Sequence, residues 1–94
     1  MNIVAHVFDF VIGVDTHANK HVFSIIQART AAEVAAASFP ASPAGNARAV
    51  AWIQRRTTQV PDRTLVSMEG TCSFGALLRS VLERKGYRVV EAPP

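Results

Sequence analysis

The sequence predicts an α/β protein built on one mixed sheet, with its elements in the order β-β-β-α-β-α-β. Three observations predict this class: strand-like apolar runs come first, two segments with helix-start signals follow, and each of those segments leads into a further strand-like run. The chain has 94 residues, 49% hydrophobic and 18% charged, and no repeat or flexible linker divides it. We therefore expect one small domain over residues 1–94, with its core at about residues 10–91.

Three segments in the first half of the chain have the composition of strands. Residues 10–14 form a continuous apolar run with two valines and one isoleucine, which is typical of a strand buried on both faces. Residues 21–27 are rich in β-branched and aromatic side chains, and residues 34–39 form a weaker strand that is diluted by alanine and closed by Pro40. With residues 28–32 as the turn between the last two, these segments predict an antiparallel meander.

A helix is predicted from Ser42 to Arg56. Ser42 provides a capping hydroxyl, Pro43 suits the first helical position, and good helix formers follow. The alternating residues 64–68 then predict a fourth strand, which ends at Glu69. The first helix therefore connects the meander to the fourth strand.

The second helix has the clearest periodicity in the chain. Ser73 is its predicted cap, and apolar residues recur after it at helical spacing. These residues are Phe74, Leu77, Leu78 and Val81. Gly86 supplies a left-handed cap at the end of the helix, and residues 87–91 predict a last strand before Pro93 and Pro94.

Charge and composition limit the classes of function. Ten basic against seven acidic residues give a formal net charge of +3 and an isoelectric point near 9.8, which permits nucleic-acid or other anionic partners without requiring them. The longest strongly apolar run, residues 10–14, is too short to span a bilayer, and a single cysteine cannot form an internal disulfide. We therefore expect no membrane partner and a cytoplasmic location.

Two acidic residues close two of the predicted strands: Asp15 follows the first, and Glu69 follows the fourth. A right-handed crossover would make these strands parallel neighbours, with the two side chains roughly 5 Å apart. Ligand sites of open α/β sheets form at this edge, and carboxylates this close repel each other unless a cation or a proton lies between them. The pattern allows a Mg²⁺ site. Spacing alone favours the alternative, in which Asp15 is a turn residue and Glu69 caps the next helix.

Other reactive residues carry weaker signals. His17 and His21 have a spacing that would suit zinc on a helix, but this stretch is predicted as a strand. Cys72 has no base assigned to it and is interpreted as a helix-cap residue rather than a nucleophile. The glycines match no nucleotide-binding pattern, so nucleotide cofactors are disfavoured.

A basic face is predicted on the first helix. Trp52 lies four positions after Arg48, three before Arg55 and four before Arg56, so these residues share one side: Arg48, Trp52, Arg55 and Arg56. Arginine with an interleaved aromatic residue is a usable nucleic-acid surface. The alternative is structural, with the tryptophan packed beneath the aliphatic stems of the arginines, and the sequence favours this alternative.

Four motifs, in order, cover almost all of residues 11–91. They are Val11-Ile12-Gly13-Val14-Asp15-Thr16-His17, Phe39-Pro40-Ala41-Ser42-Pro43-Ala44-Gly45, Met68-Glu69-Gly70-Thr71-Cys72-Ser73-Phe74-Gly75 and Gly86-Tyr87-Arg88-Val89-Val90-Glu91. Their combination resembles the amino-terminal, RuvC-like domain of the DEDD transposases of the insertion-sequence one-ten family. The resemblance implies an RNase H-like fold with sheet order 3-2-1-4-5. It also implies that Asp15 matches the first aspartate of the catalytic tetrad and Glu69 its glutamate, both as ligands of Mg²⁺.

The resemblance implies a function and partners as well. Full-length members of the family are DNA transposases or recombinases that cleave and transfer DNA strands with divalent metal and a structured, guide-like RNA. The expected partners are therefore DNA, such an RNA and further copies of the chain. In this picture Asp15 and Glu69 bind metal, and the basic helix face contacts phosphate.

The chain departs from the family pattern in three places. Cys72 stands where glycine is usual, and Ala18 and Asn19 stand where lysine or aspartate is frequent. The other two tetrad aspartates, which relatives carry in a Lys-x-Asp-x-x-Asp segment, have no counterpart before Pro94. We therefore expect a truncated domain that is inactive as this 94-residue chain. The alternative is a catalytically inactive remnant that acts only as a folded interaction module.

Overall fold

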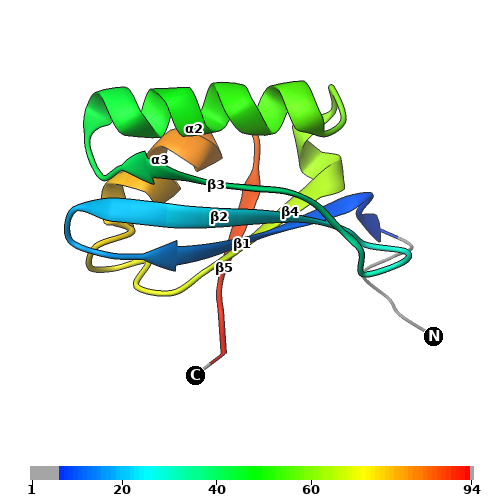
Figure 1. The fold of residues 1–94 in the computed structure, drawn as a ribbon, viewed down its shortest axis with the longest axis horizontal. Coiled ribbons are helices and arrows are strands. Elements are labelled where there is room, and N and C mark those ends of the chain that lie inside the picture. Colours follow the sequence, from blue (N-terminus) through cyan, green and yellow to red (C-terminus); the bar gives the residue numbers. More distant parts are fainter. Residues whose placement is uncertain (1–6, 94) are drawn as a thin grey trace.

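A computed structural model describes residues 7–93, which form a five-stranded mixed sheet with two helices along one side (Figure 1). The strands are β1 (Phe10–Thr16), β2 (Lys20–Gln27), β3 (Glu33–Pro40), β4 (Thr64–Met68) and β5 (Arg88–Glu91). Their order across the sheet is β3-β2-β1-β4-β5. The predicted α/β class and the sheet order 3-2-1-4-5 are confirmed.

The predicted meander is present. β1 pairs antiparallel with β2, and β2 pairs antiparallel with β3. β1 continues past its predicted end because its last two residues still pair with β2: Asp15 lies opposite Val22, and Thr16 lies opposite His21. Asp15 is therefore part of the strand rather than of the turn that follows it.

Helix α2 (Pro43–Arg56) connects the meander to β4, which pairs parallel with β1. The helix begins as predicted, since Ser42 is its N-cap and the Ser42 Oγ accepts a hydrogen bond from the Gly45 N–H at 3.0 Å. A short 3-10 turn, η1 (Pro61–Arg63), precedes β4. β5 adds parallel to β4, so the carboxyl ends of β1, β4 and β5 meet at one edge of the sheet.

The second helix, α3 (Ala76–Arg84), starts later than predicted. Ser73 is not its cap, since Gly75 precedes the helix and provides no side-chain hydrogen bond. The physical reason is the carbonyl of Gly70, which accepts from the Ser73 N–H at 3.0 Å and from the Gly75 N–H at 2.8 Å. These bonds hold residues 71–75 in turns.

The buried apolar face of α3 is smaller than its periodicity predicts. Leu78 and Leu82 are fully buried, but Phe74 and Leu77 are 60% and 67% exposed. The periodicity of the sequence therefore overestimates the buried face. The end of the helix is as predicted, because Gly86 adopts a φ of 95° and so provides the left-handed cap.

The core lies between the sheet and the two helices. Alternate strand residues point into it, including Ile12, Phe23 and Met68, and α2 contributes Trp52 and Ile53. The intervening strand residues point to the opposite face, which neither α2 nor α3 covers. The sheet thus has one packed face and one open face.

An aromatic cluster joins α2 to β2 and β3. The ring centroids of Phe23 and Phe39 are 5.7 Å apart, and Trp52 lies 6.3 Å from Phe23 and 5.7 Å from Phe39. The rings meet at 60° to 75°, near the edge-to-face arrangement that aromatic pairs prefer. Trp52 is only 6% exposed and is therefore a core residue.

Gly45 allows the first turn of α2 to lie against the end of β3. A β-carbon at this position would overlap the backbone carbonyl of Pro40, which cannot rotate away as a side chain could. We expect Gly45→Ala to lower the free energy of unfolding by about 2 kcal/mol or more, as overpacking does in rigid sites. Urea unfolding monitored by circular dichroism measures the change.

Gly13→Ala is the matched control. A β-carbon at Gly13 would meet no atom within 4 Å, so the same substitution there should change the free energy of unfolding by less than about 0.5 kcal/mol. Equal effects of the two substitutions would show that the contact with Pro40 does not limit the position of α2.

Candidate metal centre

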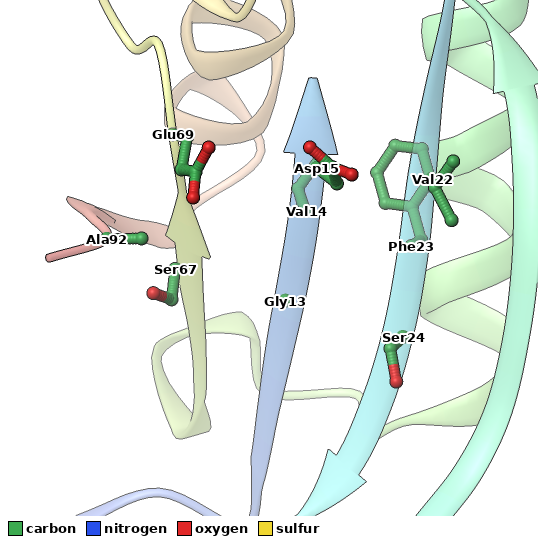
Figure 2. Close-up of a pocket in the computed structure, with 9 residues that line it drawn as sticks. All are labelled: Gly13, Val14, Asp15, Val22, Phe23, Ser24, Ser67, Glu69 and Ala92. Atoms are coloured by element: carbon green, nitrogen blue, oxygen red, sulfur yellow. The ribbon is translucent and has the colours of Figure 1, made fainter. Parts of the chain in front are cut away.

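Asp15 and Glu69 lie at the ends of two neighbouring parallel strands. Asp15 is the next-to-last residue of β1, and Glu69 directly follows β4. The register pairs Val14 with Met68, so the next residue on each strand is one of the two acids. Figure 2 shows both side chains at this edge of the sheet. The structure therefore brings together the two acids that the sequence identifies as a pair.

Both acids line an open cavity of about 330 Å³ on the face of the sheet that α2 and α3 leave uncovered (Figure 2). The other lining residues are uncharged: Gly13, Val14, Val22, Phe23, Ser24, Ser67 and Ala92. Gly13 is the central residue of β1, two positions before Asp15, and its missing side chain leaves open space above the strand. A charged ligand can therefore approach the backbone closely here.

Short contacts hold the two strand ends. Thr16 Oγ1 donates to the carbonyl of Glu69 at 2.9 Å, which ties the end of β1 to the residue after β4. The Asp15 carboxylate lies 3.2 Å from His17 Nε2, with side chains that are 63% and 50% exposed. Both acids remain accessible to solvent.

His21 lies in the core rather than at the acid pair. The residue is 2% exposed, and its Nδ1 accepts a hydrogen bond from the backbone N–H of His17 at 3.4 Å. Burial lowers the pKa of His21 because it disfavours the charged imidazolium, and the nearby His17 adds to this effect. Of His17 and His21, it is His17 whose side chain lies beside the Asp15 carboxylate.

Glu91 is a residue of this edge that the sequence did not reveal. It ends β5, and its carboxylate accepts hydrogen bonds from the turn that follows Glu69. The Gly70 N–H donates at 3.0 Å, the Thr71 N–H at 3.1 Å and the Thr71 hydroxyl at 2.6 Å. These bonds, led by the one from the Thr71 hydroxyl, lower the pKa of Glu91. The signal that identified Asp15, an acid at the end of a parallel strand, also applies to Glu91.

The donor set of the acid pair fits Mg²⁺. Across residues 7–93, no group of three histidine, cysteine, aspartate or glutamate side chains gathers where it could hold a metal ion. Mg²⁺ keeps several waters and is commonly held by one or two carboxylates, whereas structural zinc needs a complete set of nitrogen or sulfur ligands. Cys72 is exposed in the turns before α3, and it is not the cap of that helix because Gly75 holds that position.

The basic face of α2 is exposed but does not lie beside the acids. Arg48, Arg55 and Arg56 are exposed on α2, which covers the packed face of the sheet, while the acids line the open face. The guanidinium carbon of Arg56 lies 5.4 Å from the ring centroid of Trp52. The Trp52 ring therefore packs against the guanidinium group of Arg56. Because Trp52 is buried, its ring is not accessible for stacking on a base.

The fold and the acid pair define a class of protein. A mixed sheet of order 3-2-1-4-5, with carboxylates at the ends of its first and fourth strands, is the arrangement expected of an RNase H-like domain. A family model described as a transposase, that of the IS110-type DEDD transposases, matches residues 12–94. The chain belongs to this transposase family, as its motifs predicted. No curated protein matches the chain significantly.

The hydrogen bonds to Glu91 should make folding depend on pH in the acid range. Because the pKa of Glu91 is lower in the folded protein than in the unfolded chain, the unfolded chain binds the proton more readily. The contribution of Glu91 to stability is therefore present above its ordinary pKa and is lost as the pH falls through the folded pKa. We expect Glu91→Gln to flatten the fall in melting temperature between about pH 5 and pH 3.

Thr71→Ser is the control, because serine keeps the hydroxyl that donates to Glu91. Thermal unfolding followed across this pH range should give a slope close to that of the native chain for Thr71→Ser. A native slope in Glu91→Gln would mean that the hydrogen bonds from the turn do not stabilise the Glu91 carboxylate.

Proposed function

We propose that this domain takes part in the metal-dependent cleavage and transfer of DNA strands, with Asp15 and Glu69 as ligands of Mg²⁺. One observation carries the proposal: two carboxylates from adjacent parallel strands line the same open cavity. The family match supports a role in transposition. The residue roles rest on the geometry and on the resemblance of the motifs.

The pairing of the acids favours a cation between them. Two carboxylates on adjacent strand ends repel each other, and a divalent ion offsets that repulsion. When bound, Mg²⁺ supplies charge that activates an attacking oxygen and stabilises a leaving one. The family tetrad includes two further aspartates, so Asp15 and Glu69 make up one part of the ligand set.

The other residues of the cavity position these ligands and leave room for the substrate. Thr16 fixes the carbonyl of Glu69, and His17 lies beside the Asp15 carboxylate, where it restricts the orientation of that group. Gly13 has no side chain and Ser67 has a small one, so neither residue fills the cavity. A nucleic-acid strand can therefore bring its phosphate close to both acids.

The partners of the domain are part of the proposal. Arg48, Arg55 and Arg56 would contact phosphate, with Trp52 as the support of Arg56. Because these arginines lie on the other side of the sheet from the acids, they would hold a different segment of nucleic acid from the one at the metal. The proposal also includes a structured RNA partner, self-association and a cytoplasmic location. The first two follow from the resemblance to the family, and the third follows from the composition. Within residues 7–93, no helix is long and apolar enough to cross a membrane.

A second candidate is a folded interaction module without catalytic activity. The observation in its favour is the exposure of Phe74 and Leu77 beside the turn that follows Glu69, since clustered apolar side chains on a surface often mark a contact with another molecule. The two candidates differ in their dependence on metal, because an interaction module has no use for the acid pair.

Metal binding tests the proposal directly. We expect Asp15→Asn and Glu69→Gln each to weaken Mn²⁺ binding by about tenfold or more, because each removes one charged oxygen ligand. Electron paramagnetic resonance of free Mn²⁺ measures the affinity. Asp62→Asn is the matched control, since Asp62 is exposed in η1 and does not line the cavity. Equal affinities in all four proteins would favour the interaction module.

Binding to DNA should depend strongly on salt through the arginines of α2. Replacing Arg48, Arg55 and Arg56 with glutamine should reduce the slope of log K against log salt by about 0.9 for each phosphate that these side chains no longer neutralise. Fluorescence anisotropy of a labelled duplex at several salt concentrations measures the slope.

The control for this experiment removes the same charge elsewhere. Arg29, Arg84 and Arg88 are also exposed, and none of them lies on α2. Their joint replacement with glutamine should leave the slope closer to the native value. A larger decrease of the slope in this control than in the α2 variant would place the nucleic-acid surface away from α2.

A further inference from the structure

Glu91 holds the peptide group that follows Glu69. The carbonyl of Glu69 and the N–H of Gly70 belong to one peptide unit, and both of its polar atoms are engaged. Thr16 Oγ1 donates to the carbonyl at 2.9 Å, and the Glu91 carboxylate accepts from the N–H at 3.0 Å. With both atoms bound, the peptide plane cannot rotate without breaking a hydrogen bond. The backbone of Glu69 is thus held at its carboxyl side.

The turn itself is held by the same carboxylate. Thr71, only 7% exposed, donates both its N–H, at 3.1 Å, and its hydroxyl, at 2.6 Å, to Oε1 of Glu91. Gly70 has a φ of 67°, in the left-handed region that favours glycine, so the chain reverses directly after Glu69. A reversal at this point leaves Glu69 without the support of a continuing strand, and the bonds to Glu91 replace that support.

The sheet places Glu91 on the opposite face from the cavity. Glu91 is the register partner of Met68, and partners on neighbouring strands point to the same side. Met68 is buried against the helices, whereas Glu69, one residue later, lines the open face. Glu91 therefore contacts the backbone of the turn from the packed side and does not compete for the metal.

From this arrangement we infer that Glu91 is a positioning residue for the metal ligand Glu69, acting through the peptide between Glu69 and Gly70. The inference rests on the proposed function, because it gives Glu69 the role of a ligand. A carboxylate suits this task because it only accepts hydrogen bonds and has lone pairs for all three donors. The amide NH2 group of a glutamine is itself a donor, so at least one of these three donors would face another donor and lose its hydrogen bond.

The test is Mn²⁺ affinity of the full chain, measured by electron paramagnetic resonance. Residues that orient metal ligands typically change affinity by 10- to 100-fold when they are replaced, so we expect Glu91→Gln to weaken Mn²⁺ binding by about tenfold. Thr71→Val, which keeps the shape of the side chain and removes the hydroxyl, should weaken it in the same direction. Thr71→Ser, which restores the hydroxyl, should recover most of the native affinity.

Two controls separate positioning from stability and from charge. Gly45→Ala is destabilised at α2 and does not line the cavity, so at a temperature where it remains folded its affinity should be native. Glu83→Gln removes a carboxylate that pairs with Arg79 at 3.4 Å, and Arg79 also lies near Glu91, so this variant reproduces the change in local charge. A loss of affinity equal to that of Glu91→Gln in either control overturns the inference.

The outcomes also distinguish this inference from the proposed function. If Asp15→Asn and Glu69→Gln weaken Mn²⁺ binding while folded Glu91→Gln and Thr71→Val bind it as the native chain does, the metal centre stands and the role of Glu91 is wrong. If Glu91→Gln does not fold, Thr71→Val decides alone. If the native chain does not bind Mn²⁺, both the metal centre and the role of Glu91 are wrong.

Discussion

The parallel pairing of β1 with β4 is the constraint on which the rest of the structure depends. These strands are far apart in the sequence, and α2 must cross one face of the sheet to bring them together. The register then pairs Val14 with Met68 in the core, and the next residues, Asp15 and Glu69, fall side by side. A shift of β4 by one residue against β1 would move Glu69 to the packed face and leave Asp15 on the open one, because side chains alternate along a strand.

The two faces of the sheet divide the functions proposed for the domain. Both helices pack on one face, where the apolar core and the aromatic cluster around Trp52 stabilise α2. The open face keeps the acids and the small residues of the cavity accessible. The arginines of α2 are consequently on the far side of the molecule from the acids, so one short stretch of nucleic acid cannot contact both.

The turn between β4 and α3 is held by backbone hydrogen bonds more than by apolar packing. The Gly70 carbonyl accepts two N–H groups from the turn and the Gly70 N–H donates to the Glu91 carboxylate, whereas the apolar side chains of Phe74 and Leu77 are exposed. The same turn carries the peptide that follows Glu69. A segment shaped by directed hydrogen bonds is suited to positioning a ligand, since its geometry does not depend on how side chains repack.

The sequence by itself determined the strands, the start of α2 at Ser42 and the left-handed cap at Gly86, and it identified Asp15 and Glu69 as a candidate pair. These depend on local propensity and on the rule that parallel strands end at one edge, and both can be read along the chain. Only the tertiary structure decided that Glu91 holds the turn at Gly70, that Ser73 caps no helix and that Phe23 and Phe39 are the aromatic partners of Trp52. The role of Glu91 depends on distance in the sequence, because a residue of β5 binds the N–H groups of Gly70 and Thr71 in the turn after β4. The partners of Trp52 are likewise distant, since Phe23 and Phe39 lie on β2 and β3. Ser73 caps no helix for a local reason: the reversed chain at Gly70 lets the Gly70 carbonyl accept the N–H groups of Ser73 and Gly75, bonds that the cap and periodicity signals do not show.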